Sequence, residues 1–158
     1  MNIGSFRQRF VLNYLKYYQL TMELPIKTQA IIYCRIKDGH KYLILKRSEI
    51  DGGYWQPVVG TVKEEESIIQ CMLREIGEEV GIKEVVEVSK QLYNFSWERD
   101  DQVYLEFVYA IEIDEKASIT LSEEHDEYLW LDFNDAVKKV KYDSNKQSIM
   151  IVEKMLRN

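Results

Sequence analysis

The sequence predicts an α/β sandwich, in which helices flank a mixed β-sheet. Three observations lead to this prediction. Segments rich in β-branched and apolar residues recur along the chain, and segments with helical spacing of apolar residues stand among them without the regular alternation of a doubly wound fold. With 158 residues and 46% hydrophobic residues, the chain fits one ordinary domain with a sizeable core.

The first two strands are predicted to form a hairpin. Thr28–Ile36 is β-branched and apolar, and Tyr42–Lys46 returns beside it. The turn Lys37–His40 between them contains Asp-Gly, which tolerates the left-handed backbone of a tight hairpin. We expect a loop at Ile50–Gly53 and a short extended piece at Tyr54–Thr61.

A helix is predicted over Glu65–Val80. Gly81 follows it at the position of a helix C-cap. Apolar residues recur there at helical spacing, so that one face should pack on the core. The predicted buried stripe consists of Ile69, Met72, Leu73, Ile76 and Val80.

The rest of the domain should supply further strands and two more helices. Two long strands are predicted near Val85–Phe95 and Gln102–Ile113, and a short one at Leu129–Leu131. Asn134–Val140 and Asn145–Leu156 are predicted helices. We interpret Asn145 as the N-cap of the last helix.

The N-terminal residues 1–21 are predicted to be a helical appendage ahead of a domain at 22–158. Apolar residues in Phe6–Leu20 recur at roughly helical spacing, which indicates a weak amphipathic helix. Basic residues interrupt the apolar ones, so we do not expect a secretory signal.

Charge and composition exclude several classes of protein. The net charge of −6 argues against nucleic acid as the main substrate, because a polyanion would be repelled. No apolar run approaches the roughly 20 residues of a membrane span. Cys34 and Cys71 lack Cys-x-x-Cys spacing, and we expect two buried thiols in a reducing cytoplasm.

Three carboxylates, those of Glu75, Glu78 and Glu79, should share one patch of the predicted helix, because residues three and four apart lie on one face. Their repulsion destabilises the helix unless a positive charge lies there. Hard divalent cations such as Mg²⁺ prefer oxygen ligands. A solvated acidic face is the alternative, but the strongly apolar opposite face should fix this helix on a core.

These residues belong to a longer pattern. Gly60–Ile82 resembles the Nudix box in full: a glycine, five residues, Glu66, seven residues, and then Arg-Glu-aliphatic-any-Glu-Glu-any-Gly-aliphatic from Arg74. The resemblance implies a Nudix-type α/β/α sandwich and an enzyme that hydrolyses a diphosphate linkage in a nucleotide-like substrate. It also implies a Mg²⁺ cofactor, with Mn²⁺ as a substitute.

The resemblance further implies a metal site. Glu75 and Glu79 would be the main ligands, with Glu78 beside them. The backbone carbonyl of Val59 or Gly60 would complete the metal shell. Most such boxes begin with two glycines, and Val59 stands here in place of the first.

Two further box residues are expected to brace the site. Arg74 and Glu66 resemble the salt bridge that holds the loop against the helix. Metal ions neutralise a diphosphate and lower the pKa of a bound water, whose proton then passes to a carboxylate. The residues leave this general base open among Glu75, Glu78 and Glu124.

Other segments are most similar to the bacterial subgroup that hydrolyses dihydroneopterin triphosphate and dATP. The similarity implies a metal role for Glu124 and phosphate contacts for Lys27 and Arg47, the latter through the guanidinium fork. Trp55 and Gln56 would contact the substrate. A solvated loop is the alternative for Glu124, plain surface for Arg47 and core for Trp55. The segments concerned are Tyr54–Gly60, Glu124-His125, Leu129–Asp132 and Ser144–Gln147.

Two alternatives remain. Dinucleoside-polyphosphate and RNA 5′-end pyrophosphohydrolases share the Trp-Gln pair but continue Pro-Gln-Gly-Gly, whereas this chain continues Pro-Val-Val-Gly to Gly60. A non-catalytic Nudix-like binding domain is the second alternative, and the complete set of box carboxylates argues against it. We therefore expect a small-molecule nucleotide or pterin triphosphate as the partner, pyrophosphate and a monophosphate as products, and a monomer or homodimer.

Overall fold

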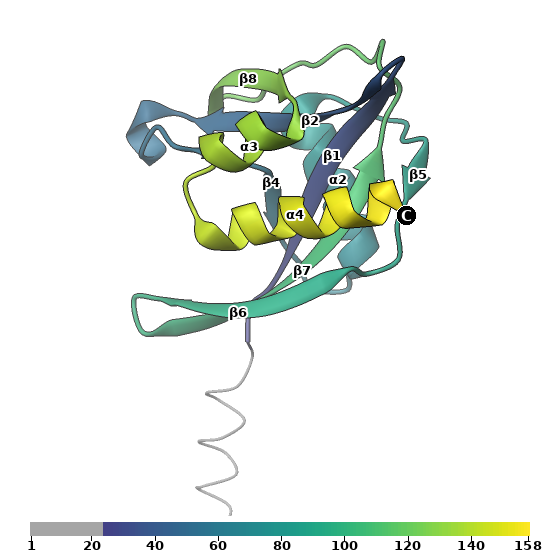
Figure 1. Ribbon diagram of the computed structural model, residues 1–158. Coiled ribbons are helices and arrows are strands. Elements are labelled where there is room, and N and C mark those ends of the chain that lie inside the picture. The colour runs from purple at the N-terminus through teal and green to yellow at the C-terminus, as the bar shows by residue number, and fades with distance from the viewer. Residues whose placement is uncertain (1–23) are drawn as a thin grey trace, which may run out of the picture.

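Eight strands form one mixed sheet in the computed structural model, which describes residues 24–158 (Figure 1). The expected appendage at 1–21, with its helix Phe6–Leu20, lies outside these residues. The strands are β1 (Ile26–Ile36), β2 (Gly39–Arg47), β3 (Trp55–Gln56), β4 (Val58–Thr61), β5 (Glu87–Val88), β6 (Tyr93–Arg99), β7 (Gln102–Glu112) and β8 (His125–Leu131). The helices are α2 (Ile68–Val80), α3 (Phe133–Lys139) and α4 (Asp143–Arg157), with a single 3-10 turn η1 (Glu49–Asp51).

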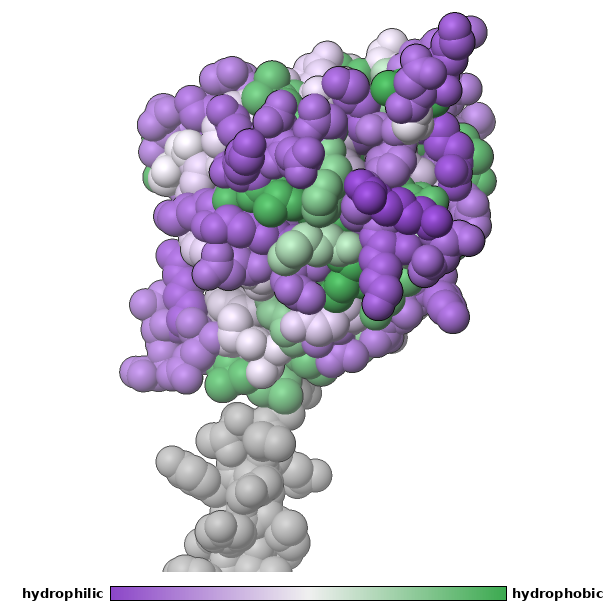
Figure 2. All heavy atoms as spheres, viewed as in Figure 1, coloured by the Kyte–Doolittle hydropathy of each residue, from purple (hydrophilic) through white to green (hydrophobic). Residues whose placement is uncertain are grey.

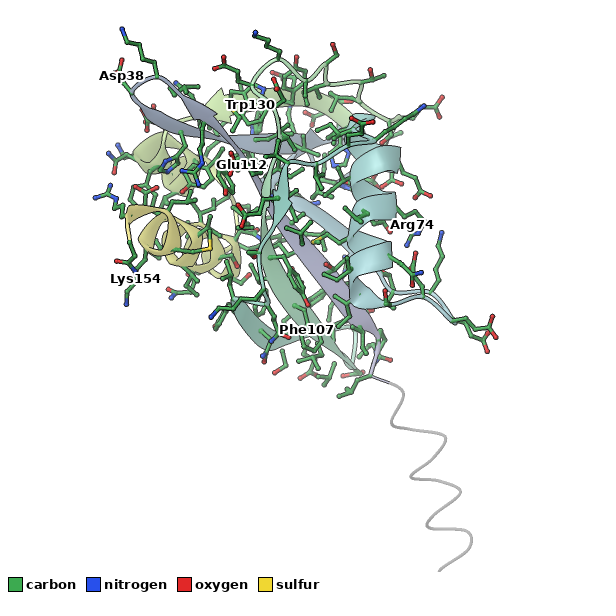
Figure 3. The ribbon with its side chains drawn as sticks, turned by 90° about the vertical axis from the view of Figure 1, so that its right-hand side faces the viewer. Asp38, Arg74, Phe107, Glu112, Trp130 and Lys154 are labelled. Carbon is green, nitrogen blue, oxygen red and sulfur yellow. The ribbon has the colours of Figure 1, made fainter. Side chains whose placement is uncertain are left out.

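The predicted α/β/α sandwich is confirmed. Helix α2 covers one face of the sheet, and α3 and α4 cover the other (Figures 1 and 3). Along β1 the side chains alternate between two cores. Ile32 and Cys34 pack on the α2 side, whereas Ile31 and Tyr33 pack on the α3–α4 side. Burial on both faces explains why this strand is almost continuously apolar.

The surface over α3 and α4 is mostly hydrophilic, with apolar residues gathered near its middle and its lower edge (Figure 2). None of the helices in residues 24–158 is long and apolar enough to cross a membrane.

Helix α2 begins later than predicted. Ser67 is its N-cap, and the Ser67 hydroxyl accepts a hydrogen bond from the Gln70 amide at 3.2 Å while the Gln70 side chain accepts one from the Ser67 amide at 2.9 Å. This capping box satisfies two amides that would otherwise be free. Glu65, where we placed the start, has a φ of 61° and lies in the preceding turn.

The buried stripe of α2 was predicted only in part. Met72, Ile76 and Val80 are buried as expected. Ile69 and Leu73 are 36% and 40% exposed, because the helix is turned so that Cys71 and Glu79 face inward instead. One glutamate of the acidic patch is therefore buried.

The strand predicted at Val85–Phe95 was wrong, because the chain forms two strands there. Both pair with β7, but the chain advances five residues from Val88 to Tyr93 while β7 advances three, between Ile111 and Val108. Two residues therefore bulge out of the ladder, and the Ser89 hydroxyl stabilises the bulge by accepting a hydrogen bond from the Ala110 amide at 2.9 Å.

Helix α4 starts two residues before the predicted position. Tyr142 is its N-cap, so the interpretation of Asn145 as the cap was wrong. Asn145 lies inside the first turn and is only 4% exposed. The strand expected at Leu129–Leu131 was also too short, since β8 extends back to His125.

One feature of the sheet positions the site: β1 and β2 pair beside their turn and then diverge. β1 pairs with β2 from Ile36 back to Tyr33, and beyond this it pairs with β4 instead. Likewise β2 pairs with β3 at Leu45 and Lys46, while β8 pairs along its other edge. We call the region where β3 and β4 lie between the diverging strands the fork. Pro57, which has no amide hydrogen to donate, separates β3 from β4.

Candidate functional site

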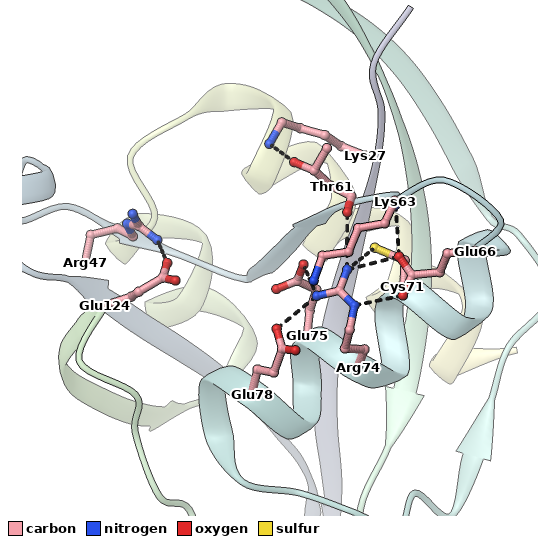
Figure 4. A network of polar contacts seen from close by, with 10 residues as sticks. All are labelled: Lys27, Arg47, Thr61, Lys63, Glu66, Cys71, Arg74, Glu75, Glu78 and Glu124. Carbon is pink, nitrogen blue, oxygen red and sulfur yellow. Dashed lines mark hydrogen bonds and ion pairs between the residues drawn. The ribbon is translucent and has the colours of Figure 1, made fainter.

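Arg74 of α2 is the centre of a network of carboxylates (Figure 4). Its Nε and Nη2 donate to Glu66 at 2.7 and 3.0 Å, the bidentate geometry that suits a guanidinium. Its Nη1 donates to Glu75 at 2.7 Å and to Glu78 at 2.9 Å. Nη2 also reaches the Thr61 carbonyl at 3.3 Å. Arg74 thus ties the end of β4 to the first turns of α2.

Glu66 accepts hydrogen bonds from Arg74 and from the Lys63 amide, and these lower the pKa of Glu66 to about 2. The hydrogen bonds that Arg74 donates to Glu66, Glu75 and Glu78 raise the pKa of Arg74. The salt bridge therefore stays charged at physiological pH. The expected pairing of Arg74 with Glu66 is present in the structure.

Gly60 lies in β4 opposite Glu75. A Cβ at Gly60 would overlap with Cγ of Glu75, so only glycine leaves room for this carboxylate to cross the strand. Val59, which replaces the usual first glycine, pairs with Gln29 as an ordinary strand residue. The missing glycine therefore imposes no strain here.

Glu79 is buried and poorly compensated. Its side chain is 5% exposed, and burial, followed by the charges of Glu75 and Glu124, raises its pKa to about 8. Within residues 24–158, its Oε2 has no hydrogen-bond partner. A buried carboxylate without partners is costly, so Glu79 is the box residue best prepared to take a cation.

His125, at the start of β8, lies beside Glu79, with Nε2 3.6 Å from Oε2. Burial, followed by the charge of Arg47, lowers the pKa of His125 to about 4, so the ring is neutral at physiological pH. In the described part of the chain, neither ring nitrogen has a hydrogen-bond partner. β8 therefore brings a neutral imidazole to the acidic patch.

Glu124 and Arg47 connect β8 to β2. Arg47 Nη1 donates to Glu124 at 2.7 Å (Figure 4). Its Nη2 lies 3.0 Å from Asp51. The charge of Glu124 contributes to the raised pKa of Glu79, which places these two carboxylates in one electrostatic environment.

The carboxylates do not converge on one point. Among the side chains of residues 24–158, no three acidic, histidine or cysteine groups are close enough together to enclose a metal ion. Arg74 holds Glu75 and Glu78, and Arg47 holds Glu124. One observation fits a cation: the unpartnered Oε2 of the buried Glu79. The ligand roles of these carboxylates, and of the Val59 and Gly60 carbonyls, stay predictions.

A cavity of about 560 Å³ lies on the α4 side of the fork. Lys27, Arg47, Gln56 and Val59 line it, and so do residues of the β6–β7 hairpin tip and of the first turn of α4. Figure 1 shows that hairpin tip and helix start on the same side of the molecule. Three of the four predicted substrate contacts, Lys27, Arg47 and Gln56, thus line one cavity, and the first two bring cationic groups to it.

Trp55 lies outside this cavity. Its ring packs on the α3–α4 core, and Nζ of Lys139 lies 4.5 Å from the ring centroid. The structure thus favours the core interpretation of Trp55 over substrate stacking. Lys27 lines the cavity, with Nζ donating to Thr61 at 2.9 Å.

Sequence reasoning missed several cavity residues. Glu106 is a single carboxylate within an apolar run of β7, and that isolation was the signal that could have revealed it. Trp97 lies in the segment beyond the strand that we ended at Phe95. Asn145 was interpreted as a cap, so its burial was not expected.

Comparison with known proteins gives one family match. A family model described as NUDIX domain matches residues 26–151. Dihydroneopterin triphosphate diphosphatase of Haemophilus influenzae is 27% identical over 143 residues, covering 82% of this chain and 89% of that protein. The octanoyltransferase of Myxococcus xanthus is 24% identical over 128 residues, covering 79% of this chain and 36% of that protein. The chain thus spans about a third of the latter's length.

Solved structures show the same fold. A C. elegans Ap4A hydrolase superposes with a TM-score of 0.75 at 20% identity, covering 85% of this chain and 98% of that one. The E. coli dihydroneopterin triphosphate pyrophosphohydrolase superposes with a TM-score of 0.71 at 25% identity, covering 84% of this chain and 95% of that one.

Proposed function

This chain belongs to the Nudix family, and from that premise we propose that it hydrolyses a diphosphate linkage in a nucleoside triphosphate-like substrate, releasing pyrophosphate and a monophosphate. Dihydroneopterin triphosphate and dATP are the proposed substrates, and the names of the relatives support the first of them. One observation carries the proposal: Arg47 lines the cavity with Lys27 and bonds to Glu124, whose charge acts on the box residue Glu79, so that the cavity adjoins the acidic patch of α2.

The family generally uses divalent metal ions, and we propose Mg²⁺, with Mn²⁺ as a substitute. Glu75, Glu78, Glu79 and Glu124, with a carbonyl of Val59 or Gly60, would hold it. Bound there, the metal would neutralise phosphate charge and make the attacking water more acidic. Glu79 is best suited as a permanent ligand because its carboxylate is buried and otherwise unpaired.

The chain's own residues would perform the remaining steps. Lys27 and Arg47 are positioned at the cavity wall to bind phosphate oxygens, and a guanidinium can do so with two bonds. Arg74 and Glu66 hold in place the loop that joins β4, which contains Gly60, to α2. Glu75, Glu78 and Glu124 are the candidates to accept the proton of the water.

The test is a substrate panel assayed with Mg²⁺, with and without EDTA. It comprises dihydroneopterin triphosphate, the deoxynucleoside triphosphates, dinucleoside polyphosphates and ADP-ribose. We expect metal-dependent release of pyrophosphate, not phosphate, from the triphosphates. Cleavage of dinucleoside polyphosphates alone would show that the chain is a dinucleoside-polyphosphate hydrolase instead. Absence of any metal-dependent hydrolysis would indicate a binding domain instead.

A further inference from the structure

Glu106 of β7 is a buried carboxylate in the wall of the cavity. It is 4% exposed, and burial raises its pKa, an effect that its hydrogen bonds and Lys27 offset only in part. Oε1 accepts a bond from the Gln29 amide at 2.6 Å, and Oε2 accepts one from the Trp97 indole at 2.8 Å. A carboxylate oxygen can accept two hydrogen bonds, so each has room for a second donor.

Asn145 brings another acceptor to the same cavity. It lies in the first turn of α4 and is 4% exposed. Its Oδ1 accepts no hydrogen bond from any of residues 24–158. Leaving a buried amide oxygen unsatisfied costs about 1–3 kcal/mol, which a donor from a bound molecule would recover. Asn145 is therefore prepared for a ligand that donates.

The cavity also has flat walls. The Trp97 ring stacks on Tyr104 at 4.3 Å between centroids and 16° between planes. Its indole N–H is committed to Glu106, so its orientation is fixed. Tyr54 and Tyr142 meet edge to face at 5.4 Å and line the same cavity. Rigid aromatic walls favour a planar heterocycle over a flexible chain.

We propose that Glu106 and Asn145 are the residues that select the heterocycle of the substrate, and that they favour a 2-amino-4-oxopyrimidine edge, as in guanine and pterins, over adenine. This inference rests on the proposed function. A 2-amino-4-oxopyrimidine edge presents a ring N–H beside an amino group, two parallel donors that match the two oxygens of one carboxylate. Adenine presents one amino group flanked by ring acceptors, which would face the carboxylate lone pairs. Because a bound adenine would leave these buried acceptors unpaired, the site should reject it.

The substitution Glu106→Gln tests the selection with little change of shape. The amide of Gln29, whose Oε1 is unpartnered within residues 24–158, can rotate to pair with the new amide, so the fold should be kept. We expect the wild-type chain to use dGTP at least tenfold better than dATP, measured as kcat/KM with Mg²⁺. The variant should lose most of that ratio, through a loss on dGTP, whereas dATP use should be retained.

Asp100→Asn is the matched control. Asp100 lies on the same hairpin, is exposed and has a φ of 52°, which asparagine tolerates well. The control removes one negative charge from the hairpin and should leave the dGTP to dATP ratio unchanged. Asn145→Leu, which keeps the volume but removes the acceptor, should lower dGTP use as Glu106→Gln does.

A binding assay separates this inference from the proposed function. The melting temperature of the wild-type chain should be raised more by dGMP or neopterin than by dAMP, and Glu106→Gln should abolish this difference. If no triphosphate is hydrolysed but this preference holds, the proposed function fails and the inference stands. A wild-type preference for adenine, or an unchanged preference in folded Glu106→Gln, would overturn the inference.

Discussion

At the scale of single residues, the acidic patch divides into glutamates that arginine compensates and one that it does not. Arg74 contacts Glu66, Glu75 and Glu78, whereas Glu79 is buried with an unpartnered oxygen in the described part of the chain. The first three are fixed by the fold, and the fourth is the residue that most needs a bound cation.

Glu79→Gln should therefore reduce turnover at least a hundredfold without unfolding the protein. Glutamine has the same shape, but it lacks the charge that we assign to the metal. The melting temperature in EDTA should not fall, because burial raises the pKa of Glu79 to about 8, so that without metal its carboxyl is mostly neutral near pH 7, as glutamine is. Steady-state kinetics at saturating Mg²⁺ and a thermal melt test this. The exposed Glu84→Gln serves as control, and near-wild-type turnover of Glu79→Gln would refute the assignment.

Gly60→Ala should disable the site by displacing Glu75. The new Cβ would overlap with Cγ of Glu75, so the carboxylate must leave its position over the strand. We expect turnover to fall at least tenfold. Gly77→Ala is the control: its Cβ would lie 3.7 Å from the Ile82 carbonyl, and alanine should stabilise the helix interior by about 0.5–1 kcal/mol. Equal activity of the two variants would contradict this steric argument.

At the scale of elements, α4 is fixed to the sheet by Glu153. This buried carboxylate accepts hydrogen bonds from Tyr42 at 2.7 Å and from Arg157 at 2.6 Å, and it lies 2.6 Å from His40. Burial alone would raise the pKa of Glu153, but these partners together lower it below its usual value of 4.5. The last helix thus depends on a charged group for part of its attachment.

Glu153→Gln should lower the free energy of unfolding by about 2 kcal/mol at pH 7. Because the folded pKa is lowered, the contribution of this carboxylate is present above pH 4.5 and is lost as the pH falls below that value. Urea denaturation at pH 7 and below pH 4.5 should show the difference between wild type and variant shrinking with acid. A difference that is constant with pH would contradict the role of the charge.

The elements that the sequence predicted well are those with a strong local pattern. The hairpin of β1 and β2 follows from its β-branched and apolar residues and its Asp-Gly turn, and the helices α3 and α4 follow from helical spacing. The bulge between β5 and β6 could not be predicted, because it depends on how both strands pair with β7.

The site likewise contains residues that a local sequence pattern predicts and residues that only the fold brings together. The box residues of α2 are contiguous in sequence, so a motif reveals them. Glu106 and Asn145 meet at one cavity only through the sheet and the position of α4, and no local spacing encodes that.

At the scale of the whole molecule, the part of the chain that matches the family begins at β1. The family model matches from residue 26, and the first strand begins at Ile26. We predict that a chain beginning at Met22 retains hydrolysis within tenfold of the full chain, per folded molecule. Kinetics and melting of both chains measure chemistry and stability separately. A folded, shortened chain with a loss of more than tenfold would show that residues 1–21 help to build the active site.

The fork has a consequence for how this protein could change. It lies between the acidic patch of α2 and the cavity at the β6–β7 tip and α4, and Arg47, which lines the cavity and bonds to Glu124, connects the two. Randomising the hairpin tip and the first turn of α4 should therefore yield libraries rich in active clones with new substrate preferences. Libraries randomised along the buried face of α2 should be mostly inactive. Adaptation to new substrates would then proceed on one side of the sheet while the chemistry is inherited unchanged on the other.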